Sequence, residues 1–343
     1  MSEEQISGDT GNVGDARGQG WTRPREPATL RGRVGFPRGR CSTPRSIYKT
    51  PEGEAEIRAL YEEALDGLGL SHESLIVKTR LGDTHVLALG PADAPPALFL
   101  PGGNFLNPIV LEWFLPLAGR HRLYAPDVVG QTGKSAQERP SPKGDGHAFW
   151  VEDVLDGLNL ARAPLVGISY GAGIAIRTMG LAPERVCRAA LVVPSGIVAV
   201  RVSRMLLEVA ATLLLYRLRP TRERLLRAVR PILTEPEDPA FGRAVRQIGA
   251  SYRHLRLDAG LPRAATEKEL ANFGGAVAVF ASEEDAFFPA RAVLPRAREI
   301  FANLTLAETL EGCRHVPSKA ALARVNERVL AFLAGSDGPS GGR

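Results

Sequence analysis

One pentapeptide has the composition of a site for nucleophilic catalysis. Gly167-Ile168-Ser169-Tyr170-Gly171 reads Gly-x-Ser-x-Gly, with an apolar run before it and small residues after it. This pattern predicts a strand, a sharp turn and a helix, with small residues flanking the serine because the turn is tight. The serine hydroxyl then lies at a helix N-terminus, where backbone N–H groups favour a developing anion. The alternative is an ordinary strand-to-helix turn in which Ser169 caps the helix.

Two later loops could supply the partners that such a serine needs. A serine hydroxyl is a weak nucleophile at neutral pH, so it requires a base that is itself oriented by a carboxylate. In a sheet of this kind the partners follow the serine in the order acid, then histidine, each after a strand. The predicted strand 276–281 leads into Glu283, Glu284 and Asp285, and the predicted strand 304–310 leads into His315. The alternative for the acidic cluster is a solvated loop that caps a helix.

Strands and helices alternate through the middle of the chain and could position these groups. Apolar runs predict strands at residues 74–79, 84–89, 97–100, 122–125, 165–168, 189–193, 276–281 and 304–310, the first two as a hairpin. Helical spacing predicts helices at residues 53–68, 109–118, 148–160, 172–181, 290–301 and 319–334. Such alternation is typical of parallel β-α-β units with helices on both faces of a sheet.

The alternation stops between residues 200 and 272. This segment has a helical composition, is rich in Arg and Leu, and is broken by several prolines. It is too long for a loop, so we expect a helical lid on one edge of the sheet. Its apolar residues fit either contact with an apolar part of a substrate or packing of the lid onto the core: Met205, Leu206, Leu207, Leu213, Leu214 and Leu215.

Composition and charge limit the classes of protein to which the chain can belong. The chain has 343 residues, 44% of them hydrophobic, which is enough for a large α/β core. Residues 1–45 hold eight arginines and five acidic residues, so three of the five net positive charges lie there, and we expect no nucleic-acid partner. The three cysteines do not suggest a disulfide framework, and no apolar run reaches the roughly 18 residues of a membrane span. We therefore expect a cytoplasmic protein without a membrane span.

Residues 47–334 resemble the α/β-hydrolase superfamily. The resemblance rests on residues 167–171, the turn Pro101-Gly102-Gly103-Asn104, residues 126–135, and the acid and histidine loops. It implies the α/β-hydrolase fold, a mostly parallel sheet with helices on both faces and a helical lid between the sixth and seventh core strands. The expected organisation is a disordered extension at 1–46, a core at 47–199 and 273–334, a lid at 200–272 and a flexible tail at 335–343.

The same resemblance implies roles for particular residues. Ser169 is the expected nucleophile and His315 the general base and acid. Similar sequences carry the acid about four residues before a proline, which favours Asp285, with Glu284 as the next candidate. The backbone N–H groups of Gly103 and Tyr170 are the expected oxyanion hole, and Asn104 is expected to bind substrate. Pro101 stands where the family usually has a histidine.

The activity that the resemblance implies is carboxylesterase-like hydrolysis of an ester or related acyl bond through a covalent acyl-enzyme. A small-molecule substrate is implied, and no cofactor or metal. The alternatives are a ligand-binding or signalling protein with little turnover, haloperoxidase-like chemistry, and hydrolysis of a C–C bond. The sequence leaves the substrate and the oligomeric state open.

Two other features suggest chemistry that we do not expect. Residues 130–135 end like a phosphate-binding loop, but Val128 stands where that loop needs a glycine, so a surface turn is the interpretation. Cys313 is too close to His315 along the chain to be a rival nucleophile, and the remaining histidines have no metal-ligand spacing: His72, His85, His121, His147 and His254.

Overall fold

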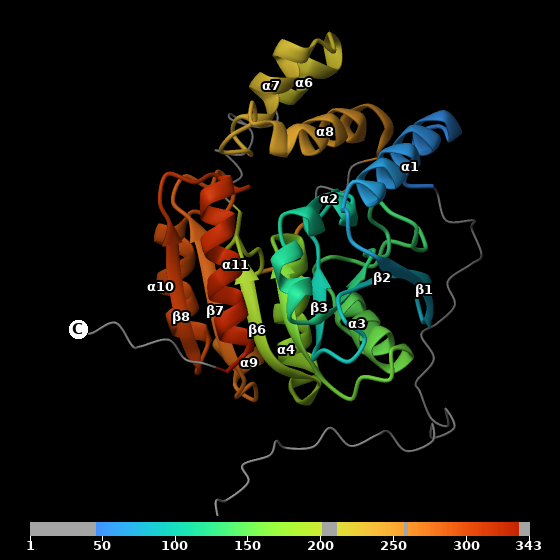
Figure 1. The fold of residues 1–343 in the computed structure, drawn as a ribbon. Coiled ribbons are helices and arrows are strands. Elements are labelled where there is room, and N and C mark those ends of the chain that lie inside the picture. Colours follow the sequence, from blue (N-terminus) through green and yellow to red (C-terminus); the bar gives the residue numbers. More distant parts are fainter. Residues whose placement is uncertain (1–45, 201–210, 257–259, 336–343) are drawn as a thin grey trace, which may run out of the picture. The chain divides into compact units, whose positions relative to one another are not determined.

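The computed structural model describes residues 46–200, 211–256 and 260–335 (Figure 1). The expectations for the N-terminal extension before Ser46, for the C-terminal tail after Gly335 and for Met205, Leu206 and Leu207 lie outside the described residues. Among the helices described, none is both long and apolar enough to cross a bilayer.

Eight strands form one sheet in the order β1-β2-β4-β3-β5-β6-β7-β8. They are β1 (His72–Thr79), β2 (Gly82–Leu89), β3 (Pro96–Leu100), β4 (Arg122–Pro126), β5 (Ala163–Ile168), β6 (Val186–Val192), β7 (Ala276–Ser282) and β8 (Leu304–Leu310). β2 is antiparallel to β1 and to β4, and the other neighbours are parallel. The predicted fold class is confirmed.

The sheet changes its direction of growth at β3. The chain passes from β3 to β4 on one side and then returns to place β5 on the other side of β3. Ligands of open α/β sheets bind at the carboxyl ends of the strands where the order reverses in this way. The loop after β3 begins at Pro101 and the loop after β5 contains Ser169. The topology therefore brings these two sequence motifs to one crevice.

Helices cover both faces of the sheet (Figure 1). One face packs against α1 (Pro51–Asp66), α2 (Asn107–Glu112) and α11 (Lys319–Leu333), and the other against α3 (Gly146–Gly157), α4 (Tyr170–Leu181) and α10 (Ala290–Ile300). Successive residues of a strand point to opposite faces, and accordingly Phe99 belongs to the first cluster while Leu98 and Leu100 belong to the second. Because both faces are covered, β3 and β5 are apolar at nearly every position.

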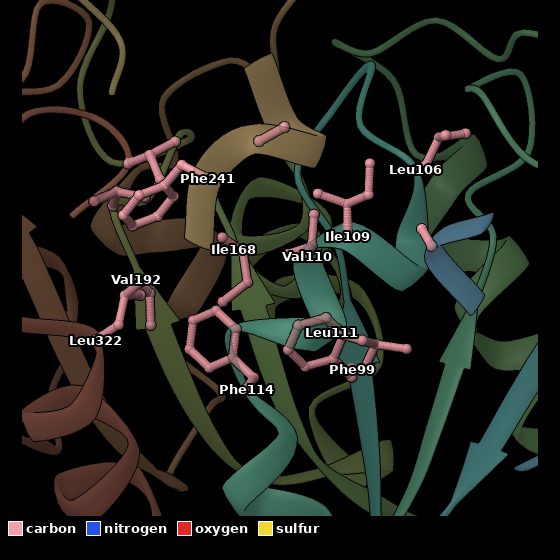
Figure 2. Packing of buried hydrophobic residues seen from close by; sticks show 14 of the residues in the cluster. Phe99, Leu106, Ile109, Val110, Leu111, Phe114, Ile168, Val192, Phe241 and Leu322 are labelled. Atoms are coloured by element: carbon pink, nitrogen blue, oxygen red, sulfur yellow. The ribbon is translucent and has the colours of Figure 1, made fainter. Parts of the chain in front are cut away.

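The first of these clusters reaches the carboxyl ends of the strands. Figure 2 shows Phe99 and Phe114, whose ring centroids are 5.4 Å apart, together with Ile168 and Val192 at the ends of β5 and β6. The predicted helix at 109–118 is wrong as a single element, because α2 ends at Glu112 and a separate 3₁₀ turn covers Leu115–Gly119. Pro116 has no N–H to donate and its ring crowds the carbonyl four residues earlier, which disfavours an α-helix through this position.

The chain between β6 and β7 is helical where it is described. It contains α6 (Ala211–Leu218), α7 (Arg222–Val229), the 3₁₀ turn Pro239–Phe241, α8 (Gly242–His254) and α9 (Glu267–Leu270). We call residues 211–272 the insertion. The chain before α1 is bonded to the end of α8. Tyr48 and Leu255 form an antiparallel bridge, and the Lys49 amide donates to the carbonyl oxygen of His254.

The interpretation of residues 130–135 as a surface turn is wrong. Asp127 is 1% exposed, and most of the following residues to Ser135 are buried. The Asp127 carboxylate accepts hydrogen bonds from the Tyr61 hydroxyl (3.1 Å) and the Lys134 amide (2.8 Å), and it lies 3.1 Å from His85 Nδ1. Burial and the charge of Asp127 hold the pKa of Tyr61 well above its usual range. These polar residues form a buried network that the local sequence pattern does not reveal.

Candidate active site

Ser169 lies in a strained turn between β5 and α4. Its φ is +50° and its ψ is −109°, a backbone conformation that costs a non-glycine residue on the order of 1–3 kcal/mol. The turn is held on both sides, because the Ser169 amide donates to the carbonyl oxygen of Val192 (2.9 Å) and its own carbonyl accepts from the Ser195 hydroxyl (3.0 Å). The helix-cap alternative is wrong, since the Ser169 side chain makes no capping hydrogen bond.

The two glycines of the motif are required by close packing. A Cβ at Gly167 would lie 2.6 Å from Cα of Ala172, inside the turn itself. A Cβ at Gly171 would overlap the carbonyl oxygen of Leu100 at the end of β3. The pentapeptide therefore needs small residues on both sides of the serine, for the reason that the sequence suggested.

A chain of hydrogen bonds links Ser169 to His315 and Asp285. Ser169 Oγ lies 2.8 Å from His315 Nε2, and His315 Nδ1 lies 2.8 Å from Asp285 Oδ2. A carboxylate only accepts, so Nδ1 carries the ring proton and Nε2 is free to accept from the serine hydroxyl. Three side chains from three separate loops thus meet with the polarity that proton transfer from the serine requires.

Asp285, rather than Glu284, contacts the histidine. Asp285 is fully buried, and its second oxygen accepts from the amides of Phe287 (2.7 Å) and Phe288 (3.1 Å). The Glu284 side chain is 54% exposed and lies 3.6 Å from Nε of Arg314. The register that places the acid four residues before Pro289 therefore matches the geometry.

The insertion helps to hold the histidine loop. Leu233 and Val316 form a parallel bridge, and the Thr234 hydroxyl donates to the carbonyl oxygen of Val316 (2.7 Å) and accepts from the Arg314 amide (2.9 Å). On its other side the His315 ring meets Phe287 edge to face, with centroids 4.9 Å apart. Sequence reasoning missed Thr234, because no local pattern connects it with a loop 80 residues later.

The turn after β3 packs directly against the serine turn. A Cβ at Gly102 would lie 3.8 Å from Ser169 Cβ, and a Cβ at Gly103 would lie 3.1 Å from Tyr170 Cβ. Tyr170 is the first residue of α4. The two residues expected to form an oxyanion hole are therefore neighbours, and Tyr170 directly follows the serine.

Asn104 is held by two glutamines that the sequence analysis did not single out. Its φ is +58°, its amide donates to Gln131 Oε1 (2.9 Å), and its carbonyl oxygen accepts from Gln247 Nε2 (2.7 Å). Gln131 comes from the buried loop after β4 and Gln247 from α8 of the insertion. Both backbone groups of Asn104 are thus occupied in fixing the turn.

Ser169 and His315 open into a cavity of about 670 Å³. Apolar residues from the core and the insertion dominate its wall, among them Trp113, Phe114, Ile168, Leu213, Ile248 and Phe287. Of the insertion's apolar residues singled out in the sequence, Leu213 and Leu214 line this cavity and Leu215 does not. A cavity of this size accommodates a small organic molecule.

Cys313 does not belong to the residues that line the cavity. Cys313 is buried and its Sγ lies 3.8 Å from the Ser318 hydroxyl. Among the residues that the structure describes, no group of three or more His, Cys, Asp or Glu side chains could hold a metal ion.

Comparison with known proteins places the chain in a family. The model of the alpha/beta hydrolase family matches residues 97–328. The chain is 28% identical over 282 residues to carboxylesterase YbfK of Bacillus subtilis (strain 168). The aligned region covers 80% of this chain and 92% of that protein.

Solved structures agree on the fold. The structure of carboxylesterase CesB (YbfK) from Bacillus subtilis aligns with a TM-score of 0.68 at 26% identity, over 83% of this chain and 99% of that one. Naproxen esterase from Bacillus subtilis aligns with a TM-score of 0.70 at 24% identity, over the same shares of the two chains. The matched residues include the serine turn, the acid loop and the histidine loop, and the chain belongs to the alpha/beta hydrolase family.

Proposed function

We propose that this protein is a serine hydrolase that cleaves an ester or related acyl bond of a small molecule. The observation that carries the proposal is the hydrogen-bonded chain from Ser169 through His315 to buried Asp285, at the wall of a largely apolar cavity. The likeness to proteins named carboxylesterases over most of the chain supports it. We further propose that residues 200–272 act as the lid of this site and that the enzyme works in the cytoplasm.

In the proposed reaction Ser169 Oγ attacks the carbonyl carbon while His315 Nε2 takes its proton. Asp285 keeps the imidazole in the required tautomer and stabilises its charged form. The N–H groups of Gly103 and Tyr170 receive the negative charge of the tetrahedral intermediate, and each such donor contributes about 3–4 kcal/mol to transition-state stabilisation.

The intermediate collapses when His315 returns the proton to the departing alcohol, which leaves an acyl ester on Ser169. Water, deprotonated by His315, then attacks this ester and releases the acid with the serine restored. The sum is ester plus water giving acid plus alcohol. No cofactor takes part in these steps.

The test combines covalent labelling with turnover. A fluorophosphonate probe should label the wild-type protein, and short p-nitrophenyl esters should be hydrolysed. Ser169→Ala should abolish labelling and nearly all hydrolysis, whereas Ser141→Ala, a change at an exposed serine, should alter neither. Labelling without turnover of any ester would favour the ligand-binding or signalling alternative, and unchanged hydrolysis in Ser169→Ala would contradict the assignment.

A further inference from the structure

The cavity that contains Ser169 has an unbalanced charge. Lys49, Arg217 and Arg256 all reach its wall. Within residues 46–200, 211–256 and 260–335, no aspartate or glutamate lines it. Among the described residues the rest of the wall is mostly apolar, so these three cations raise the electrostatic potential of the wall that the described residues form.

Three separate segments contribute the cations. Lys49 follows the segment that pairs with Leu255, Arg217 lies on α6, and Arg256 follows the end of α8. Lys49 Nζ donates to the carbonyl oxygens of Tyr252 (3.0 Å) and Arg253 (2.8 Å). Arg256 Nη1 donates to the carbonyl oxygen of Tyr48 (2.5 Å). These bonds fix two of the side chains, and their acceptors are neutral backbone carbonyl groups.

The cluster differs from several other arginines of the insertion. Arg230, Arg243 and Arg246 each pair with a glutamate. In the part of the chain that the structure describes, none of the three cavity cations lies within 4.0 Å of a carboxylate. Burial, and then the charges of Arg217 and Arg256, lower the pKa of Lys49 from its ordinary value. Mutual repulsion therefore penalises the cluster, and an anion bound among the three would remove that penalty.

The chemistry of the wall defines the matching ligand. Ser169 and His315 lie in the segments that follow strands β5 and β8, while Arg217 and Arg256 belong to the insertion. All four residues line the same cavity. A guanidinium presents a planar fork that binds a carboxylate through two hydrogen bonds. We propose that the substrate is an ester that carries a carboxylate at its far end, bound by Lys49, Arg217 and Arg256 while Ser169 attacks the ester carbonyl. This inference rests on the proposed function and narrows its substrate class.

The first experiment compares matched substrates. The p-nitrophenyl monoesters of dicarboxylic acids of increasing length would be measured against the same compounds with the far carboxyl group converted to a neutral methyl amide. At the best chain length we expect kcat/KM to favour the carboxylate by about tenfold, which corresponds to one good charged hydrogen-bonding contact. The preference should fall as ionic strength rises, because salt screens partly exposed charges.

Variants then locate the effect. Arg217→Gln should lower the ratio of carboxylate to neutral kcat/KM by about fivefold or more. Arg219→Gln removes the same charge two residues further on, at an exposed position outside the cavity wall, and should leave the ratio unchanged. Equal or faster turnover of the neutral series, or an equal loss of preference in both variants, would overturn the inference.

A binding measurement separates this inference from the proposed function. Ser169→Ala protein would be titrated by calorimetry with a non-hydrolysable amide that carries the far carboxylate and with its neutral counterpart. Tighter binding of the carboxylate supports the cation site even if every ester proves inert, in which case only the proposed hydrolysis fails. Equal binding of the two amides contradicts the cation site whatever the turnover.

Discussion

The half of the site on the sheet and the half on the insertion are held in different ways. On the sheet, the backbone of Ser169 is hydrogen-bonded on both sides and both oxygens of Asp285 are occupied. On the insertion, Leu214 and Leu218 of α6 are 59% and 73% exposed, and several arginines are held by surface ion pairs. The groups proposed to make and break bonds are therefore fixed by buried contacts, whereas the wall that meets the rest of the substrate is less constrained.

The two halves meet at defined contacts. Gln247 of α8 donates to the turn at Asn104, Thr234 holds the histidine loop, and Glu269 of α9 pairs with Arg177 of α4. If the comparison is correct, changes within the sheet half should cost the most activity. Changes at the first contact should cost less, and changes at the last contact should alter stability without altering chemistry.

The largest effect is expected at Asp285. Asp285→Asn should lower kcat by about a thousandfold or more with little change in KM, because the amide can favour the wrong tautomer of His315 and cannot stabilise the imidazolium. Steady-state kinetics on one p-nitrophenyl ester would measure this. Glu284→Gln is the matched control, since its side chain is 54% exposed, and kcat should stay within about twofold. If Glu284→Gln were the impaired variant, the assignment of the acid would be wrong.

Much of the sheet half could be predicted from the sequence. Strands β5 and β7 are short and apolar, so both their existence and the position of the residues directly after them can be predicted from the local pattern. The spacing between Asp285 and Pro289 selected the acid that contacts His315.

The contacts between the halves could not be predicted in this way. Gln247 and Asn104 are 143 residues apart, and Gln131 appeared to lie in a surface turn because its polar neighbours are typical of one. The loop that contains Gln131 is hydrogen-bonded to Asp127 through the Lys134 amide, and the Asp127 partner Tyr61 comes from α1. Lys49 and Arg256 likewise converge only when the chain before α1 pairs with the end of α8. Single-sequence patterns carry no signal for such distant partners.

A smaller effect is expected at Gln247. Gln247→Leu leaves the carbonyl oxygen of Asn104 without this donor, which costs about 1–3 kcal/mol where the group stays buried. Because that turn carries Gly103, we expect kcat to fall by about tenfold while KM changes by less than about twofold. Steady-state kinetics and thermal unfolding would both be measured.

A matched control for Gln247 lies beside it. Arg246 lies on the same helix, α8, and forms an exposed ion pair with Glu63 of α1. Arg246→Gln removes this pair and should leave kcat unchanged. If Gln247→Leu lowered the melting temperature but left kcat intact, Gln247 would support the fold alone and would not position the turn.

The smallest effect is expected at Glu269, and it should appear in stability alone. Its carboxylate bonds to Arg263 and Arg177, and hydrogen bonds from these guanidinium groups hold the pKa of Glu269 well below its usual range. A carboxyl group whose pKa is depressed by folding stabilises the protein above its unfolded pKa, and this contribution is lost as pH falls through the folded value. Glu269→Gln should therefore lower the free energy of unfolding by about 1 kcal/mol at neutral pH, discounted for partial exposure.

The difference between wild type and Glu269→Gln should narrow as pH falls below about 4, where the unfolded carboxyl group becomes protonated. Urea unfolding at neutral and at acidic pH would measure it, with Glu267→Gln as a control that removes an exposed charge from the same short helix. The turnover of esters should be unchanged, since Arg177 and Glu269 lie outside the cavity wall. A loss of kcat comparable to that of Gln247→Leu would mean that the end of the insertion also governs the chemistry, and the contrast between the two halves would then be false.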